Sequence, residues 1–228
     1  MPPTPVFLTE HIRAIEAWAC GLPDPPPLME RAGLAAAQLT QRVVGEQSRK
    51  ILVLAGPGNN GGDALVAARH LKDAWFDVRV VFTGDAGKLM PDAKAALDAW
   101  QQSGGGLSPE IPVDFSWDLA LDGLFGIGLE RDLDLRHAQL VAALNVSPKP
   151  VIAIDIPSGL HADSGRVLGG AVHAAHTITF IGYKAGLFTR DGPDHAGEVV
   201  LETLGVQGAP PPAGHGFLID REIIANVL

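Results

Sequence analysis

Polar side chains that could bind or transform a small ligand follow four apolar runs of the sequence. They are carried by Gly56–Asp63 (GPGNNGGD), Asp122–Leu129 (DGLFGIGL), Asp155–Leu160 (DIPSGL) and Tyr183–Gly186 (YKAG). Together these segments offer carboxylates, amides, a hydroxyl and a lysine. Such groups can transfer protons, hold phosphate oxygens or ligate a hard cation. The segments therefore indicate a binding site with acid/base chemistry.

The first segment is rich in glycine and stands between an apolar run and a helical pattern. Glycines let the backbone approach a ligand closely, and free N–H groups at a helix start can hold phosphate oxygens. Asn59 and Asn60 add side-chain amides, and Asp63 adds a carboxylate. A plain glycine turn with Asp63 as a helix cap is the alternative. Two adjacent asparagines exceed what a turn needs, which favours a binding loop.

The other three segments are ambiguous when each is taken alone. Asp122 could simply cap the turn after it, and Asp155 could form an Asx turn before Pro157. Lys184 could be a solvated surface lysine. The ambiguity shrinks if all four segments meet at one edge of a sheet, because ligands of open α/β sheets bind beyond the carboxyl ends of the strands. Asn60, Asp122 and Ser158 would then supply oxygens from three loops, a set that suits a hard cation.

The elements that must position these groups are strands that alternate with helices. The apolar runs predict strands at Ile51–Ala55, Val78–Phe82, Leu119–Leu121, Val151–Asp155, Thr177–Ile181 and Val199–Leu204. Helical patterns cover Glu10–Cys20, Leu28–Val44, Ala64–Ala74, Ala93–Gln102 and Gln139–Leu144. This alternation predicts a mainly parallel sheet covered on both faces.

The ends of the chain give weaker signals. Residues up to Pro5 are expected to be frayed, and Thr9 is expected to cap the first helix. Small residues in Leu28–Val44 suggest close packing, either on a partner subunit or within the chain. Residues 1–207 are predicted to form one domain, and 208–228, rich in Gly, Pro and Ala at first, a linker or tail.

Composition excludes several classes of protein. The net charge of −9 argues against generic nucleic-acid binding but allows a phosphate-bearing small molecule. The sequence has no apolar run of roughly 18–20 residues and no secretory pattern. A single cysteine, Cys20, fits a reducing compartment, so we expect a cytoplasmic protein that does not bind membranes. His173 and His176 lack a third soft ligand and are interpreted as surface histidines.

The order of the motifs resembles that of a known family, the YjeF N-terminal family of NAD(P)HX epimerases. The matching segments are Leu28–Gly33 (LMERAG), Gly56–Asp63, Leu121–Leu129, Asp155–Leu160, Thr177–Gly186 and Glu198–Val206. They follow the family's order and cover nearly the whole chain. GPGNNGGD and DIPSGL together are highly specific.

The resemblance implies a Rossmann-like three-layer α/β/α sandwich, a homodimer and a potassium ion bound by Asn60, Asp122 and Ser158. It implies Asp155 at the reactive ring, and we expect Asp155 and Lys184 to be the catalytic pair. The substrates would be NADHX and NADPHX, the hydrated forms of NADH and NADPH. The implied substrate-binding residues are Asn59, Asn60, Gly61, Gly62, Asp63, Gly126, Ile127, Gly128, Leu129, Glu130, Arg131, Asp132 and Asp155.

The sequence departs from the family pattern at two residues, and its length raises a third question. Ala64 replaces a usual glycine and could crowd the ligand, and His176 replaces an acidic residue. Many bacterial relatives continue into an NAD(P)HX dehydratase domain, whereas this sequence stops at Leu228. The chain is thus a lone epimerase or a piece of a two-domain enzyme, fused to or partnered with a dehydratase.

Epimerisation must invert C6 of the hydrated nicotinamide ring. The hypothesis is reversible loss of the C6 hydroxyl, assisted by the ring nitrogen, with Asp155 as the acid/base. Lys184 sets the charge state of Asp155 or contacts phosphate, and the sequence leaves both roles open. The alternatives are a non-catalytic nucleotide-binding or scaffold module, and a dehydrogenase or methyltransferase. Asp85, after the second strand, keeps the dehydrogenase alternative open.

Overall fold

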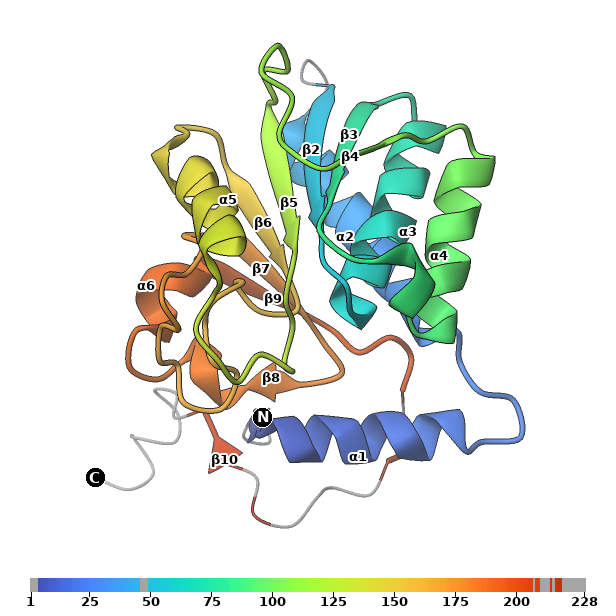
Figure 1. The fold of residues 1–228 in the computed structure, drawn as a ribbon. Coiled ribbons are helices and arrows are strands. Elements are labelled where there is room, and N and C mark those ends of the chain that lie inside the picture. The colour runs from blue at the N-terminus through green and yellow to red at the C-terminus, as the bar shows by residue number, and fades with distance from the viewer. Residues whose placement is uncertain (1–3, 46–48, 207, 210–213, 215, 219–228) are drawn as a thin grey trace.

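Seven parallel strands form the central sheet of the protein, seen here in a computed structural model that describes residues 4–45, 49–206, 208–209, 214 and 216–218. The strand order is β4-β3-β2-β5-β6-β7-β9 (Figure 1). The strands are β2 (Lys50–Ala55), β3 (Asp77–Phe82), β4 (Leu107–Ser108), β5 (Leu119–Gly123), β6 (Val151–Ile154), β7 (His176–Phe180) and β9 (Glu198–Glu202). The prediction of a mainly parallel α/β sheet is confirmed.

Helices cover both faces of the sheet, which explains the continuous apolar runs of the central strands. Three helices pack on one face, α2 (Leu28–Val44), α3 (Asn59–Asp73) and α4 (Pro91–Gln102), and α5 (Leu135–Val146) packs on the other. The remaining helices are α1 (Thr9–Cys20), α6 (Gly192–Ala196) and the short 3-10 helices η1 (Ala86–Lys88) and η2 (Ala185–Leu187). In the part of the chain that the structure describes, no helix is long and apolar enough to cross a bilayer.

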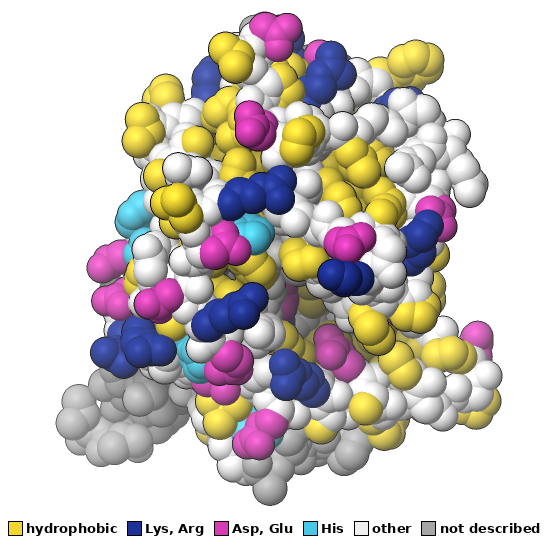
Figure 2. All heavy atoms as spheres, viewed as in Figure 1, with side chains coloured by type: hydrophobic (Ala, Val, Ile, Leu, Met, Phe, Trp, Pro, Cys, Tyr) yellow, Lys and Arg dark blue, Asp and Glu magenta, His cyan; other side chains and the backbone are white. Residues whose placement is uncertain are grey.

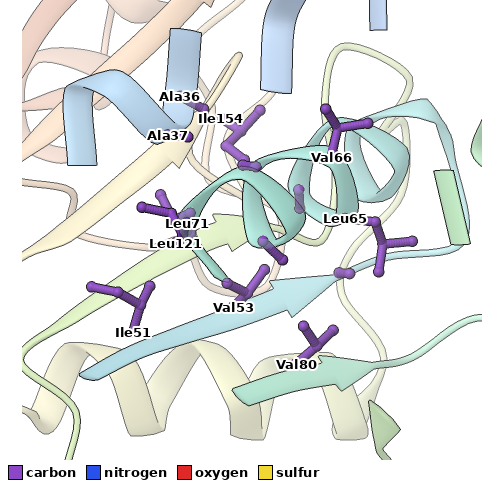
Figure 3. Close-up of a cluster of buried hydrophobic side chains, with 14 of the residues drawn as sticks. Ala36, Ala37, Ile51, Val53, Leu65, Val66, Leu71, Val80, Leu121 and Ile154 are labelled. Carbon is purple, nitrogen blue, oxygen red and sulfur yellow. The ribbon is translucent and has the colours of Figure 1, made fainter. Parts of the chain in front are cut away.

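The main core lies where α3 is packed between α2 and the sheet. Figure 3 shows aliphatic side chains of α3 directed toward those of the strands, with alanines of α2 behind them. The approach of α2 is close, because a Cβ added to Gly33 would lie 2.4 Å from the Cβ of Val66. Ala32, Ala36 and Ala37 are likewise buried in this cluster. This small-residue face therefore packs within its own chain, which settles the alternative left open by the sequence.

A second, three-stranded sheet joins distant parts of the chain. Strand β1 (Pro5–Phe7) pairs in parallel with β8 (Tyr183–Lys184) and antiparallel with β10 (Gly216–Phe217). The expectation of a frayed end up to Pro5 is thus wrong at Pro5 itself. From β1 the chain enters α1, which lies below the carboxyl ends of the large sheet in Figure 1. The proposed linker falls partly outside the described residues, and its division from the domain stays a prediction.

Several predicted boundaries differ from the structure. Thr9 does not cap α1, because its N–H and hydroxyl both donate to Asp163 Oδ1, at 2.6 and 2.8 Å. Helix α5 contains the predicted helical segment Gln139–Leu144 and begins at Leu135, where the Asp134 carboxylate caps it by accepting from the His137 N–H at 3.0 Å. Helix α3 begins at Asn59, five residues before the predicted start.

Candidate functional site

The four polar segments open onto one cavity of about 1070 Å³ at the carboxyl ends of the strands. Strand β3, which follows β2 in the sequence, lies on one side of β2, and β5 lies on its other side. The cavity is therefore at the point of the sheet where the strand order changes direction, which is the usual ligand site of such sheets. Its volume is slightly above the roughly 300–1,000 Å³ common for small-molecule pockets. The four segments contribute Pro57–Asn60 and Asp63, Leu124–Leu129, Asp155 and Lys184.

The glycine-rich loop after β2 lies backbone against backbone on the loop after β5. The Gly56 N–H donates to the Gly123 carbonyl at 3.0 Å, and a Cβ at Gly56 would lie 1.7 Å from the Leu124 carbonyl oxygen. A Cβ at Gly61 would lie 2.0 Å from the Gly56 carbonyl oxygen. Glycine is needed at these positions because two loops and a helix start share a space that holds no side chain.

The N-terminus of α3 is suited to bind an anion. Its cap residue, Gly58, offers no side-chain hydrogen bond, and Gly58, Asn59 and Asn60 all line the cavity. The first N–H groups of a helix have no partner within the helix, so they and the helix dipole favour a phosphate. Ala64 is fully buried, and its methyl group lies against Gly123 of β5. Ala64 does not line the cavity.

Asp122 and Ser158 join the loops after β5 and β6. Both residues are fully buried, and the Ser158 hydroxyl and N–H donate to the Asp122 carboxylate at 2.6 and 2.8 Å. The Leu124 N–H also donates to Asp122, and the Phe125 N–H donates to the Ser158 hydroxyl oxygen at 2.9 Å. Burial raises the pKa of Asp122 to about 6, against the lowering effect of its hydrogen bonds to Ser158 and Leu124. This network fixes the relative positions of the two loops.

Asn60 lies next to this network with an unsatisfied side chain. Its amide oxygen and nitrogen are buried and have no hydrogen-bond partner among the described residues. The oxygen lies 3.3 Å from the position that a Cβ would take at Gly126, directly after Phe125. A buried amide normally has partners, so an unpartnered one indicates that something else binds there. Within the described residues, no three His, Cys, Asp or Glu side chains are grouped to hold a metal ion.

Asp155 and Lys184 form a buried ion pair at the cavity. Strand β6 ends at Ile154, one residue before the predicted end, because Asp155 turns the chain with a φ of 67°. The Lys184 ammonium donates to Asp155 Oδ1 and, at 2.7 Å, to the Phe180 carbonyl. Lys184 is fully buried, so the alternative of a solvated surface lysine is wrong. Both groups that accept hydrogen bonds from the ammonium belong to the protein. This favours the role in which Lys184 acts on Asp155 and disfavours the role in which it contacts phosphate.

The sequence reasoning missed the wall that α1 contributes. Arg13, Glu16 and Cys20 of α1 line the cavity. Burial, followed by the charge of Asp155, raises the pKa of Glu16. The signal was present in the sequence, because Glu16 falls four residues after Ile12 and so shares the apolar face of the helix.

Asp63 adds a further carboxyl group to the cavity. It lies in the second turn of α3 and is not the helix cap. Burial, then the charges of Asp155 and Glu16, raise its pKa well above the ordinary value, while Lys184 lowers it. Of the carboxyl groups that line this cavity, Glu16, Asp63 and Asp155 therefore interact electrostatically with one another and with the buried Lys184.

Some of the predicted binding residues lie away from the cavity wall. Gly61 and Gly62 are buried within α3, and Glu130, Arg131 and Asp132 are exposed to solvent. Glu130 pairs with His161 at 3.2 Å.

The two predicted surface histidines differ in exposure. His173 is exposed and stacks on His195, whereas His176 is partly buried at the start of β7, 3.5 Å from Glu198. On the face drawn in Figure 2, acidic and basic side chains are intermingled, without one large basic patch.

Comparisons with known proteins give a consistent result. The family model described as "YjeF-related protein N-terminus" matches residues 26–186. The NAD(P)H-hydrate epimerase of Achromobacter xylosoxidans is 44% identical over 80% of this chain and 88% of its own length. That of Bordetella pertussis is 42% identical over 88% of each chain.

Two further matches concern chain length and fold. A bifunctional NAD(P)H-hydrate repair enzyme of Leishmania braziliensis is 40% identical over 79% of this chain but only 33% of its own length. The crystal structure of the yeast protein ynu0, YNL200c, superposes with a TM-score of 0.70 at 21% identity, covering 86% of each chain. This last match shows that the fold is shared.

Proposed function

The chain belongs to the YjeF-related protein N-terminus family, and from that premise we infer that it is an NAD(P)H-hydrate epimerase. This enzyme is an isomerase that interconverts the R and S forms of NADHX and NADPHX. The observation that carries the inference is the buried Asp155–Lys184 pair in a large cavity beside the uncapped N-terminus of α3. The ion pair would carry out proton transfer, and the helix N-terminus would bind the phosphates.

We propose that the dinucleotide binds with its phosphates at the start of α3 and its hydrated ring at Asp155. The support is that Asn59 and Asn60 line the cavity at the helix start, while Gly126–Leu129 line it from the loop after β5. Asp155 would protonate the C6 hydroxyl of one epimer as it leaves and, in the reverse direction, accept a proton from the water that adds on the same face. Lys184 would position Asp155 through their ion pair.

The test is to follow the R and S epimers separately during incubation with the purified chain. Asp155→Asn keeps the shape of the side chain but removes proton exchange, so epimerisation should fall by about two to four orders of magnitude. Dinucleotide binding should weaken far less, because phosphate contacts belong to another loop. A folded Asp155→Asn variant with the wild-type rate at saturating substrate would remove Asp155 from the mechanism.

The same experiment separates the alternatives. A non-catalytic binding module would bind the dinucleotide without changing the ratio of epimers, and a dehydrogenase would consume NADH by hydride transfer. The dehydrogenase alternative depends on Asp85 as a ligand of the ribose. In the structure the Asp85 carboxylate caps η1 by accepting from the Gly87 N–H at 2.9 Å. This structural role accounts for Asp85 and weakens the dehydrogenase alternative.

We propose a potassium ion held by Asn60, Asp122 and Ser158. The support is the buried, unpartnered Asn60 oxygen beside the Asp122–Ser158 network, an all-oxygen donor set that fits a hard cation. A bound ion would neutralise the buried carboxylate and tie three loops together. Potassium should then raise the melting temperature of the wild type more than sodium or choline at equal ionic strength. Asn60→Ala should lose this difference, and an equal response of wild type to all three salts would contradict the site.

We further propose that the protein is a cytoplasmic homodimer that works with an NAD(P)HX dehydratase. The single cysteine supports a reducing compartment, and the bifunctional name of the Leishmania relative supports a fused or separate dehydratase partner. The N-terminal helices would contribute to the dimer interface through faces other than the small-residue face of α2, which is buried inside the chain. Sedimentation at micromolar concentration tests the dimer, and a strictly monomeric species would contradict it.

A further inference from the structure

The cavity contains a second carboxyl group on the wall that faces the end of the sheet. Asp155 stands at the end of β6, whereas Glu16 comes from α1, which crosses below the carboxyl ends of the strands (Figure 1). Both residues line the cavity. The two carboxyl groups thus approach the same space from different elements.

The position of Glu16 is fixed by the way α1 is held. Before the helix, β1 pairs with β8, so that Phe7 lies opposite Lys184 in the small sheet. At its first turn, Thr9 is hydrogen-bonded to Asp163 twice. Ile12 and Ile15, on the side of the helix next to Glu16, are buried. Helix α1 is therefore anchored at its start and along one face.

Glu16 has no structural role that would account for a carboxyl group there. It is half-buried, and no described residue makes a hydrogen bond or ion pair with it. The charged groups that act on it are Asp155, Lys184 and Arg13, and it acts in turn on Asp63. Burial and Asp155 favour its protonated form, so it can serve as a proton donor.

Inversion of C6 involves both faces of the ring. The hydroxyl leaves from one face, and water must add to the other. A single rigidly held carboxyl group is within hydrogen-bond reach of only one face, since proton transfer requires heavy-atom separations of about 2.6–3.2 Å. We propose that Glu16 is a second acid/base residue, acting on the ring face opposite Asp155. This inference rests on the proposed epimerase function.

The proposed steps balance as follows. The Glu16 carboxyl gives its proton to the C6 hydroxyl oxygen, the C–O bond breaks, and water leaves with the bonding pair. The ring nitrogen's lone pair forms a C=N bond to C6. A water molecule on the other face then attacks C6, the C=N pair returns to nitrogen, and the Asp155 carboxylate takes the proton released. The reverse direction uses Asp155 as the acid and Glu16 as the base.

Oxygen-18 exchange separates the two faces. In water enriched in oxygen-18, each carboxyl group can remove and return a hydroxyl on its own face, which labels one epimer without inversion. Glu16→Gln should therefore lower inversion by about two to four orders of magnitude while keeping enzyme-dependent label exchange in one epimer. Asp155→Asn should keep exchange in the other epimer. Spontaneous exchange is subtracted with an enzyme-free sample.

Two variants serve as comparisons. Glu10→Gln, on the same helix but exposed, should leave both inversion and exchange unchanged. Glu16→Asp withdraws the carboxyl by one methylene and should lower inversion more than exchange on the Asp155 face. Glu16→Asp also provides the test if Glu16→Gln does not fold.

The outcomes are distinct. Wild-type inversion in folded Glu16→Gln, or equal loss of inversion and of exchange in both epimers, would overturn the role of Glu16. If the wild-type protein itself does not invert NADHX or NADPHX, the proposed function fails instead. Exchange confined to opposite epimers in Glu16→Gln and Asp155→Asn is the expected result.

Discussion

Replacing Lys184 by methionine tests how the ion pair at the site is stabilised. Methionine keeps an unbranched chain of similar length but carries no charge. The Lys184 side chain is 1% exposed and that of Asp155 is 13% exposed, so water can do little to replace the lost ammonium. Among the described residues, Asp155 would retain as donors the Phe180 N–H at 3.3 Å and the Thr179 hydroxyl at 3.5 Å.

The expected loss of stability is large. Removing one partner of a buried ion pair typically costs about 3–5 kcal/mol, because the other charge remains buried. With a urea dependence of about 2 kcal/mol per molar, the unfolding midpoint of Lys184→Met should fall by about 1.5–2.5 M. Asp155→Asn should relieve much of this, so that the double variant is more stable than additivity predicts by up to about 3 kcal/mol.

Urea unfolding of the wild type, the two single variants and the double variant forms a double-mutant cycle that measures this coupling. Lys94→Met is the matched control, because Lys94 pairs with Asp98 one turn away on the surface of α4, where such pairs contribute only about 0.3–0.5 kcal/mol. A loss below about 1 kcal/mol in Lys184→Met would refute the reasoning. Additivity of the two single variants within about 0.5 kcal/mol would do the same.

Two further predictions follow from the cavity. Since the pKa of Asp63 is raised in the folded state, its ionisation costs folding free energy as the pH rises above the ordinary carboxyl range. Asp63→Asn should therefore have a higher urea midpoint than wild type at pH 8 and lose that advantage toward pH 4, and equal midpoints at both values would contradict the shift. Gly56→Ala should cost about 1–3 kcal/mol or more and lower activity, because its Cβ meets the Leu124 carbonyl oxygen at 1.7 Å. Gly106→Ala, whose Cβ meets nothing within 4 Å, should change stability by no more than about 0.5 kcal/mol in a parallel measurement.

The sequence predicted the elements whose signals are local. The runs that became β2 and β6 are apolar and continuous because both faces of the sheet are covered, and each is followed by residues that favour turns. The sequence pattern predicts the start of α3 too late, because its glycines have low helix propensity and only their packing reveals the helix. Gly61 lies against Gly56, and Gly62 lies against Met29.

The parts that the sequence did not predict depend on contacts between distant residues. Strands β1, β8 and β10 are too short to show an alternation of apolar and polar residues in the sequence. Each pairs with a strand that lies far away in the chain. The burial of Lys184 could not be read from its neighbours, since its main partner, Asp155, belongs to another loop. Glu16 had a periodicity signal, but only the placement of α1 showed that its face borders the cavity.

The pairing of β1 with β8 has a consequence for the order of events during synthesis. The segment that anchors α1 emerges from the ribosome before the large sheet, yet its partner strand is made only after six strands of that sheet. Contacts between such distant residues form slowly, because a long loop must close before they stabilise anything. The nascent chain should therefore expose the apolar face of α1 until the strand carrying Lys184 has been made. Chaperones that recognise exposed apolar helices are expected to bind that face during this interval.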